Sequence, residues 1–571
     1  MAFNAPPPSS PAASIANGTD NARYTDYPLA MGVITTIFFM WGFLTCLNDI
    51  LIPHLKAVFE LNYARVMLVQ FTFFGAYFLM SLPAGRLVAA LGYKRGIVSG
   101  LAIAAVGAFG FWPAATLHSY GAFLGALFVL ATGITVLQVA ANPYVALLGP
   151  ERTSSSRLTL AQALNSLGTT LAPYLGGLLI LAAVSSAIPK NVQDAPETQQ
   201  LISSLNEQPA AQAVQTMQQA PAERLAAALG GIAGPTLDKL PTDALVAQSE
   251  RFTPAVLGAV LDKLPSDKLL AILKSQSAER LAALPSEPLA KALDSLTGSH
   301  LDDAQTTQLK QFRDGLPATV SDRLKAYREH QSEVVKLPYV GLGIVLLLLA
   351  AGVWLFNMPA LTETTEKADT SHHTLADALS HPHVLFGVLA IFFYVGAEVS
   401  IGSFMVNYLS LPNIGQMSEQ TATHYVSLYW GGAMVGRLVG SALMVRLSPR
   451  KLLGAFATIN MLLVMTTMLT HGMVAVYSVV AIGLFNSIMF PTIFALGIER
   501  LGPLTGKASS LLIMAIVGGA IVPYVQGMVA DHIGVQHAFF LPLFCYAYIV
   551  FYGLRGSRIH DTATLNSLRA V

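Results

Sequence analysis

Two carboxylates lie within segments that otherwise carry almost no charge. Asp49 stands in FLTCLNDILIP and Glu398 in FFYVGAEVSIGSF. An ionisable side chain inside an apolar membrane helix is costly unless it faces a cavity or a partner, so both are candidate functional groups. Partial removal from water favours the protonated carboxyl group and allows proton exchange near neutral pH. We therefore predict proton coupling at both residues, the alternative being a structural hydrogen bond.

Side-chain amides recur at helical spacing in two neighbouring apolar segments. Gln162 and Asn165 lie on one face of a predicted helix, and Gln138 and Asn142 share a face of the helix before it. Amides offer donors and acceptors to a hydroxyl-rich ligand such as a sugar, although they also join neighbouring membrane helices. An indole can pack against the apolar face of a sugar ring. The candidate substrate-binding residues are Trp41, Gln138, Asn142, Gln162, Asn165 and Asn486.

The composition is that of a membrane protein. The 571 residues are 53% hydrophobic and only 11% charged, against about a quarter charged in soluble chains. A helix of about 20 apolar residues crosses a bilayer, and twelve segments have this length. Both cysteines, Cys46 and Cys545, fall within them, so we expect no disulfide framework. The predicted segments are 30–53, 63–90, 96–116, 119–149, 158–187, 338–357, 383–410, 424–446, 452–471, 472–497, 508–530 and 537–554.

An internal repeat divides these segments into two sets of six. Residues 138–177 and 486–527 align with one another, and the following residues match at unchanged spacing: Pro143, Gly149, Glu151 and Arg152 with Pro491, Gly497, Glu499 and Arg500. Two homologous membrane halves are typical of alternating-access transporters, with the substrate site between the halves. The sequence therefore predicts an all-α membrane protein with twelve helices in two pseudo-symmetric bundles.

Basic residues gather in the short loops after even-numbered segments, which places these loops and both termini in the cytoplasm. We expect a disordered tail at 1–29, segments one to five within 30–187, and segments seven to twelve within 383–554, followed by a tail at 555–571. Segment six occupies 337–357, and 358–382 is a cytoplasmic linker. The basic residues are Arg86, Lys94, Arg95, Arg152, Arg157, Arg446, Arg450, Lys451, Arg500 and Lys507.

Residues 188–336 differ from the rest because they contain no membrane-length apolar run. LDKLP and AERLAA each occur twice, and LPTD and LPSD each open a short amphipathic pattern with Thr242 or Ser266 as the expected helix cap. We predict a helical insertion on the periplasmic or extracellular side, the alternative being a partly disordered spacer. No catalytic constellation stands out in it.

The longest motifs resemble the glucose/galactose members of the fucose–galactose–glucose:proton symporter family within the major facilitator superfamily. They are FLTCLNDILIPHLK, LQVAANPYVALLGPE, SRLTLAQALNSLGTTLAPYLGG and FPTIFALGIERLG. The resemblance covers all twelve segments and omits 188–336. It implies the major facilitator fold, two six-helix bundles around a central cavity, and sugar uptake driven by a cation gradient.

The resemblance also suggests roles for single residues. Asp49 matches an intramembrane carboxylate of the fucose permease branch, and Gln162 and Asn165 match amides that line its sugar cavity. That branch has a carboxylate where this chain has Gln138, and Gln where this chain has Glu398. Fucose is therefore a doubtful substrate, and Glu398 is our candidate to replace the missing proton site.

Charged residues of the cytoplasmic loops are candidates for gating. GRLVAALGYKRG and GRLVGSALMVRLSPRK correspond in the two halves, although Ala89 stands where the superfamily's loop motif has Asp. We expect Glu151 and Glu499 to pair with Arg86 or Arg437 when the cytoplasmic side is closed, the alternative being loop charges that only follow the membrane topology. The candidate gating residues are Arg86, Arg95, Glu151, Arg437 and Glu499.

The sequence as a whole predicts a secondary transporter of the inner membrane that takes up glucose or galactose with protons. The alternatives are sodium coupling and a non-transporting sugar sensor that uses the insertion. No nucleophile–base pair or metal motif occurs in any segment, so we expect no enzyme activity, cofactor or metal site. The expected partners are a hexose, a proton and the bilayer, without nucleic acid, and we expect a functional monomer.

Overall fold

The structure is a computed structural model, which describes residues 27–59, 63–180, 188–232, 234–261, 263–298, 303–359, 374–411, 413–415, 417 and 419–559. Within these ranges the regular structure is helical, as expected where a bilayer leaves no water to pair with the backbone. Residues 1–26, 360–373 and 560–571 form most of the two predicted tails and the predicted linker, and they lie outside the described residues.

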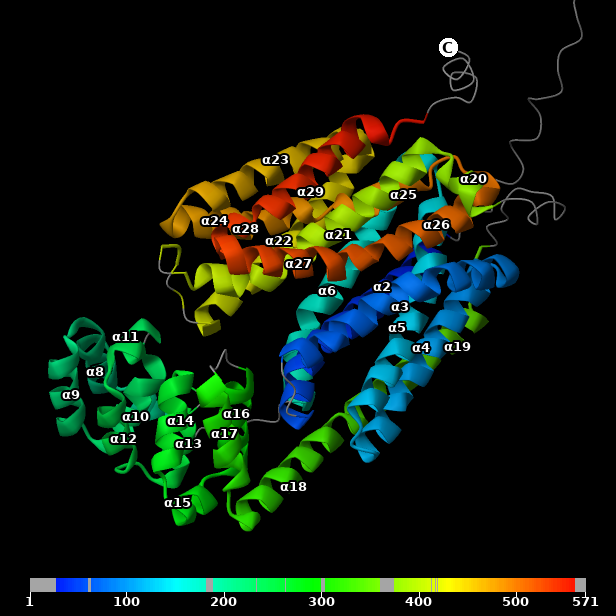
Figure 1. The fold of residues 1–571 in the computed structure, drawn as a ribbon. Helices are drawn as coiled ribbons and strands as arrows, with labels where there is room; N and C mark the ends of the chain where they lie inside the picture. The colour runs from blue at the N-terminus through cyan, green and yellow to red at the C-terminus, as the bar shows by residue number, and fades with distance from the viewer. Residues whose placement is uncertain are drawn as a thin grey trace, which may run out of the picture.

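The first half consists of six long helices, of which the sixth follows the insertion. Figure 1 shows α19 alongside α4, although the two are far apart in the chain. Glycines permit a close contact between α4 and α5, where a Cβ at Gly107 would overlap Leu130 and one at Gly133 would overlap Ala104. The helices are α2 (Tyr27–Phe59), α3 (Tyr63–Leu91), α4 (Tyr93–Thr116), α5 (Tyr120–Leu147), α6 (Ser154–Ile180) and α19 (Lys336–Leu355).

The second half contains two spans that are not continuous helices. The predicted segment 472–497 is split into α24 (Gly472–Asn486) and α25 (Met489–Gly497), and segment 508–530 contains a 3₁₀ turn at Ala515–Val517. A short helix, α20 (Leu375–Leu379), precedes this half and starts with a capping box at Thr374. The other helices are α21 (Pro382–Leu409), α22 (Glu419–Arg446), α23 (Pro449–Leu469), α26 (Thr505–Met514), α27 (Gly518–Ile533), α28 (Val535–Ala538) and α29 (Phe540–Phe551).

Eleven helical stretches in the described residues are long and apolar enough to cross a membrane. The twelfth predicted span, 158–187, corresponds to α6, which has 27 residues and is not among the eleven. Its sequence carries Gln162, Asn165 and several hydroxyl side chains, so it is less apolar than its neighbours.

Small residues join the two halves near the loops α3–α4 and α5–α6, which we call the basic-loop end. Ser156 and Ser441 exchange hydrogen bonds across the halves: each hydroxyl donates to the other residue's carbonyl, at 2.7 and 2.9 Å. At a second contact between the halves, α3 packs against α26, and a Cβ at Gly85 would overlap the Ser510 hydroxyl. The halves therefore make tight contact at this end.

The insertion forms its own group of helices, which Figure 1 shows projecting from the end opposite the basic-loop end. Leucines and alanines of α8 to α18 build a hydrophobic core separate from the core of the bundle. Pro241 and Pro265 occupy the N-cap positions, so the expected capping by Thr242 and Ser266 is wrong. The helices are α7 (Lys190–Gln193), α8 (Pro196–Glu207), α9 (Ala210–Gln219), α10 (Ala222–Gly231), α11 (Gly234–Lys239), α12 (Thr242–Ser249), α13 (Pro254–Leu261), α14 (Ser266–Ser275), α15 (Ala278–Ala283), α16 (Ser286–Gly298), α17 (Asp303–Asp314) and α18 (Ala318–Val334).

Arginines tie successive insertion helices together. Arg251 donates to the carbonyls of Met217, Gln218 and Ala220, and Arg280 to those of Ser249, Glu250 and Phe252. In the same way, Arg323 donates to the carbonyls of Ala282 and Leu284 at the end of α15. Because the last carbonyls of a helix lack intrahelical partners, these contacts satisfy them and fix the stacking of the short helices.

We expect Gly85→Val to separate the halves at the basic-loop end, because the added methyl groups take the space of Ser510. The test is labelling of Ser156→Cys by a membrane-impermeant maleimide, in a background in which Cys46 and Cys545 are replaced. Labelling should be several-fold faster than without the valine. Gly75→Val is the matched control, since a Cβ at Gly75 on the same helix meets nothing within 4 Å. Equal labelling rates in all three proteins would contradict the contact.

Candidate functional site

The four amides of the first half lie on α5 and α6, and three of them are almost entirely buried. Gln138, Asn142 and Gln162 expose 1%, 0% and 4% of their surface. Gln138 Nε2 donates to the Tyr77 hydroxyl of α3 at 2.7 Å. Asn165 Nδ2 donates to the Phe38 carbonyl of α2 at 3.0 Å, so this amide joins two helices of the same half.

Four polar atoms of these amides have no hydrogen-bond partner among the described residues. They are Gln138 Oε1, both side-chain atoms of Asn142, and Gln162 Nε2. A buried polar atom without a partner costs about 1–3 kcal/mol. The four atoms include donors and acceptors, which is the combination that a hydroxyl group can satisfy. The first half therefore offers a polar surface with unused hydrogen-bonding capacity.

The second half is centred on the break between α24 and α25. A proline has no N–H to bond the carbonyl four residues earlier, so Pro491 leaves the Ser487 carbonyl without its helical partner. Arg437 Nε on α22 donates to this carbonyl at 3.2 Å. The Tyr394 hydroxyl donates to the neighbouring Asn486 carbonyl, also at 3.2 Å.

The repeated proline has a similar effect in the first half. Pro143 on α5 leaves the Val139 carbonyl without a helical N–H, and this carbonyl accepts a hydrogen bond from Ser509 of the second half at 3.2 Å. α5 stays continuous through this point. A side-chain donor thus reaches the freed carbonyl in each half.

Asn486 is the centre of a side-chain hydrogen-bond network. Its Oδ1 accepts from Tyr546 at 2.7 Å and from Asn460 at 2.9 Å, while its Nδ2 donates to Tyr429 at 2.7 Å. The Asn486 side chain is 1% exposed and uses both of its polar atoms within the second half. It therefore positions α22, α23, α24 and α29 relative to one another.

Glu398 lies beside this network, on α21. Its Oε1 accepts a hydrogen bond of 2.7 Å from Tyr394, the same hydroxyl that bonds the Asn486 carbonyl. The Glu398 side chain is part-buried, neither sealed in the core nor fully in water. A carboxyl group held by a hydrogen bond and still partly accessible can gain and lose a proton.

Arg437 connects the halves, and it does so differently from the expected pairing with an acidic residue. Its Nη1 donates to the Gln162 carbonyl at 3.3 Å and to the Ser166 hydroxyl, both on α6 of the first half. Ser166 is buried and belongs to the same polar stripe as Gln162. The second-half arginine therefore contacts the helix that carries candidate substrate-binding residues.

The two acidic gating candidates have other partners. Glu499 pairs with Arg450 of its own half, and Glu151 lies 3.8 Å from Arg500, which is a pair between the halves. Because Arg500 and Glu151 are 65% and 54% exposed, this contact contributes only about 0–1 kcal/mol. Burial raises the pKa of Glu499, against the opposing attraction of Arg450. Arg86 and Arg95 form no ion pair within the described part of the chain.

The remaining two candidates are Asp49 and Trp41, and the structure describes the side chain of Trp41 only. The side chain of Asp49 lies outside the described residues, although its backbone belongs to α2. Trp41 is 7% exposed and packs against Phe38, with ring centroids 5.2 Å apart. Its indole is therefore mostly enclosed by protein.

Sequence reasoning missed a buried pair of polar residues between α21 and α27. Ser400 Oγ and both side-chain atoms of Gln526 are buried and have no hydrogen-bond partner among the described residues. These helices pack closely, since a Cβ at Gly396 would overlap Val522, one turn before Ser400 and Gln526. An amide in an apolar segment was the signal that selected Gln138, and it would have selected Gln526 too.

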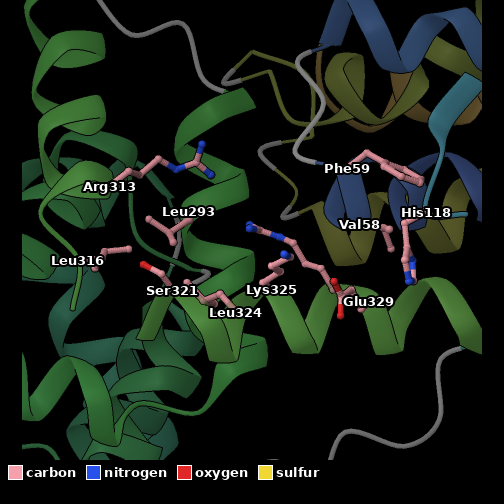
Figure 2. Close-up of a pocket in the computed structure, with 11 residues that line it drawn as sticks. Val58, Phe59, His118, Leu293, Arg313, Leu316, Ser321, Leu324, Lys325 and Glu329 are labelled. Carbon is pink, nitrogen blue, oxygen red and sulfur yellow. The ribbon is translucent and has the colours of Figure 1, made fainter. Parts of the chain in front are cut away.

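The described residues also line an open pocket of about 500 Å³ where the insertion meets the bundle. Figure 2 shows Val58, Phe59 and His118 on one side and Arg313 and Lys325 on the other. His118 Nδ1 lies 2.7 Å from the Ser332 hydroxyl, and Arg328 pairs with Asp294 at 3.0 Å. The contact of His118 with Ser332 attaches the insertion to the first half, whereas the pair of Arg328 and Asp294 joins α18 to α16 within the insertion. Neither contact involves the amides or Glu398.

The fold and this site between two halves define a membrane transporter. The Major Facilitator Superfamily model matches residues 30–187. A crystal structure of the transporter FucP in an outward conformation superimposes with a TM-score of 0.65 and 27% identity. The superposition covers 92% of this chain and 98% of FucP.

The sequence relatives identify the family within this class. The chain is 39% identical to the glucose/galactose transporter of Brucella abortus (biovar 1, strain 9-941), across 95% of this chain and 97% of that protein. It is 28% identical to the L-fucose-proton symporter of Escherichia coli K12, across 93% of each. The chain belongs to the glucose/galactose transporter family of the major facilitator superfamily, and its relatives are transporters rather than enzymes.

We expect Asn486→Leu to lower the apparent Tm of the purified protein. The substitution leaves the hydroxyls of Tyr429 and Tyr546 and the Asn460 amide without a buried partner, each at about 1–3 kcal/mol. Thr466→Leu is the control, because this exposed hydroxyl bonds only its own helix, at Leu462. A Tm of Asn486→Leu equal to that of the control would show that the network does not hold the second half together.

Proposed function

We propose that the chain takes up glucose or galactose together with protons by alternating access. The names of the Brucella and Escherichia coli relatives support the sugar and the proton respectively. The observation that carries the proposal is a set of three neighbouring amides on α5 and α6, Gln138, Asn142 and Gln162, whose buried atoms have no hydrogen-bond partner among the described residues. A hydrogen-bonded, part-buried carboxyl group, Glu398, lies in the other half.

The sugar is held mainly by the first half. Its hydroxyls take up the hydrogen-bonding capacity of Gln138, Asn142 and Gln162, each of which has an unpaired buried atom. Asn165 fixes α6 against α2. Trp41 and Asn486 shape the site through packing and through the position of the second half.

Glu398, together with Asp49, carries the proton. Tyr394 can donate to Glu398 in its charged form and, after rotation of the hydroxyl hydrogen, accept from the protonated form. Protonation removes a charge from the membrane interior, so it lowers the cost of enclosing the site. The same argument applies to Asp49 through its place in an apolar segment.

The halves rock about this site. The contacts at the basic-loop end, Ser156 with Ser441 and Gly85 with Ser510, close that side of the bundle. The similarity to an outward-conformation crystal structure supports the assignment of this end as the inner one. The loop charges then place both termini in the cytoplasm and the insertion outside, in a monomer of the bacterial inner membrane.

We expect Gln162→Ala and Asn142→Ala each to weaken glucose binding roughly 3- to 10-fold, the effect of one lost hydrogen bond. Binding is measured by calorimetry on the purified protein. Thr135→Val is the control on α5, because the Thr135 hydroxyl bonds only the Ala131 carbonyl of its own helix. Unchanged affinity in both alanine variants would rule out the first-half amides as the sugar site.

We expect Glu398→Gln to abolish uphill sugar accumulation in proteoliposomes while sugar exchange across the membrane continues. Glutamine keeps the hydrogen bond to Tyr394 but cannot carry a proton, so binding survives and coupling is lost. Counterflow of labelled glucose measures the exchange. Accumulation at the wild-type level would exclude Glu398 as a coupling residue and leave Asp49.

A further inference from the structure

Arg437 makes three hydrogen bonds that belong to two different halves. Its Nε binds the Ser487 carbonyl freed by Pro491, and its Nη1 binds the Gln162 carbonyl and the Ser166 hydroxyl. All three acceptors are uncharged. In the described residues, no carboxylate lies within ion-pair distance of this guanidinium.

Glu398 and Arg437 meet at the break between α24 and α25. The Tyr394 hydroxyl bonds both Glu398 and the Asn486 carbonyl, and Arg437 donates to the carbonyl of the next residue, Ser487. The positive charge of Arg437 therefore attracts the Glu398 carboxylate. The other titratable neighbours of Glu398 are Tyr394 on its own helix, Tyr429 on α22 and Tyr546 on α29. The tyrosines are neutral at physiological pH. The charge of Glu398 therefore acts mainly on Arg437.

We propose that Arg437 links proton binding to sugar binding. Its hydrogen bonds to Gln162 and Ser166 of α6, which we call the latch, hold the two halves together when Glu398 is protonated and no sugar is bound. The proposal rests on the proposed function. A charged Glu398 competes with α6 for the guanidinium and loosens the latch. A protonated Glu398 carries no charge and does not compete, so Arg437 Nη1 keeps its hydrogen bonds to Gln162 and Ser166.

Sugar releases the latch from the other side. Gln162 Nε2 has no hydrogen-bond partner among the described residues, and the backbone carbonyl of the same residue accepts from Arg437. A sugar bound to this nitrogen therefore changes the position of that turn of α6. The empty deprotonated carrier and the carrier loaded with proton and sugar can then both reorient. The carrier with a proton alone cannot. This selectivity prevents proton leak and is the condition for symport.

The test is Arg437→Met, with proton flux measured by an internal pH dye in proteoliposomes under an imposed proton gradient. Without sugar, we expect proton entry to rise about tenfold over wild type, the equivalent of losing one hydrogen bond from a charged donor. Glucose counterflow should continue, which also shows that the variant is folded. Arg446→Met is the control, since Arg446 is an exposed arginine at the end of the same helix.

Ser166→Ala provides a second variant that changes only the acceptor on α6. It keeps both charges and should show a smaller sugar-independent leak than Arg437→Met. A wild-type protein whose sugar transport moves no protons would refute the proposed function. Wild-type symport with no leak in either variant would refute the latch alone.

Discussion

Carbonyl groups released from a helix inside the membrane need another donor, and the two halves of this transporter meet where such carbonyls lie. Pro143 and Pro491 occupy matching positions of the internal repeat. Each removes the N–H that would pair with a carbonyl one turn earlier, and the donors that replace it are Ser509 and Arg437. Ser509 bonds across the halves directly, and Arg437 also reaches α6. Since lipid provides no water to replace these bonds, the repeated proline helps to place the contact between the halves.

The two halves have diverged in what they do with their polar groups. In the second half, Asn486 and the surrounding tyrosines satisfy one another and hold the broken helix. In the first half, α5 remains continuous, and atoms of Gln138 and Asn142 stay unpaired within the described residues. The Tyr394 hydrogen bond that keeps Glu398 in place suits a proton, and the unpaired amide atoms of α5 and α6 suit a sugar. Coupling the two needs a contact between the halves, which Arg437 makes.

Most of the fold could be predicted from the sequence, because apolar length, the repeat and the proline positions are direct consequences of the membrane. The break between α24 and α25 could not be predicted. The turn after Asn486 contains no glycine, and a proline such as Pro491 is equally compatible with a helix that is kinked but continuous. Asn486 was selected from the sequence as a substrate-binding residue and not as the centre of a hydrogen-bond network. Tyr394 and Tyr546 were not selected, because tyrosines in apolar segments usually serve packing. The pairing of Glu151 and Glu499 with Arg86 or Arg437 was wrong. Loop charges indicate the side of the membrane, and their partners depend on helix positions that no local pattern specifies.

The central claim is that this fold uses a proton gradient to accumulate a hexose, and uptake of labelled glucose into proteoliposomes tests it most directly. The purified full-length chain is reconstituted without sodium, and an inward proton gradient is imposed. The account predicts accumulation above the external concentration, abolished by a protonophore and unaffected by added sodium. Accumulation that requires sodium, or no glucose movement under either gradient, would contradict it.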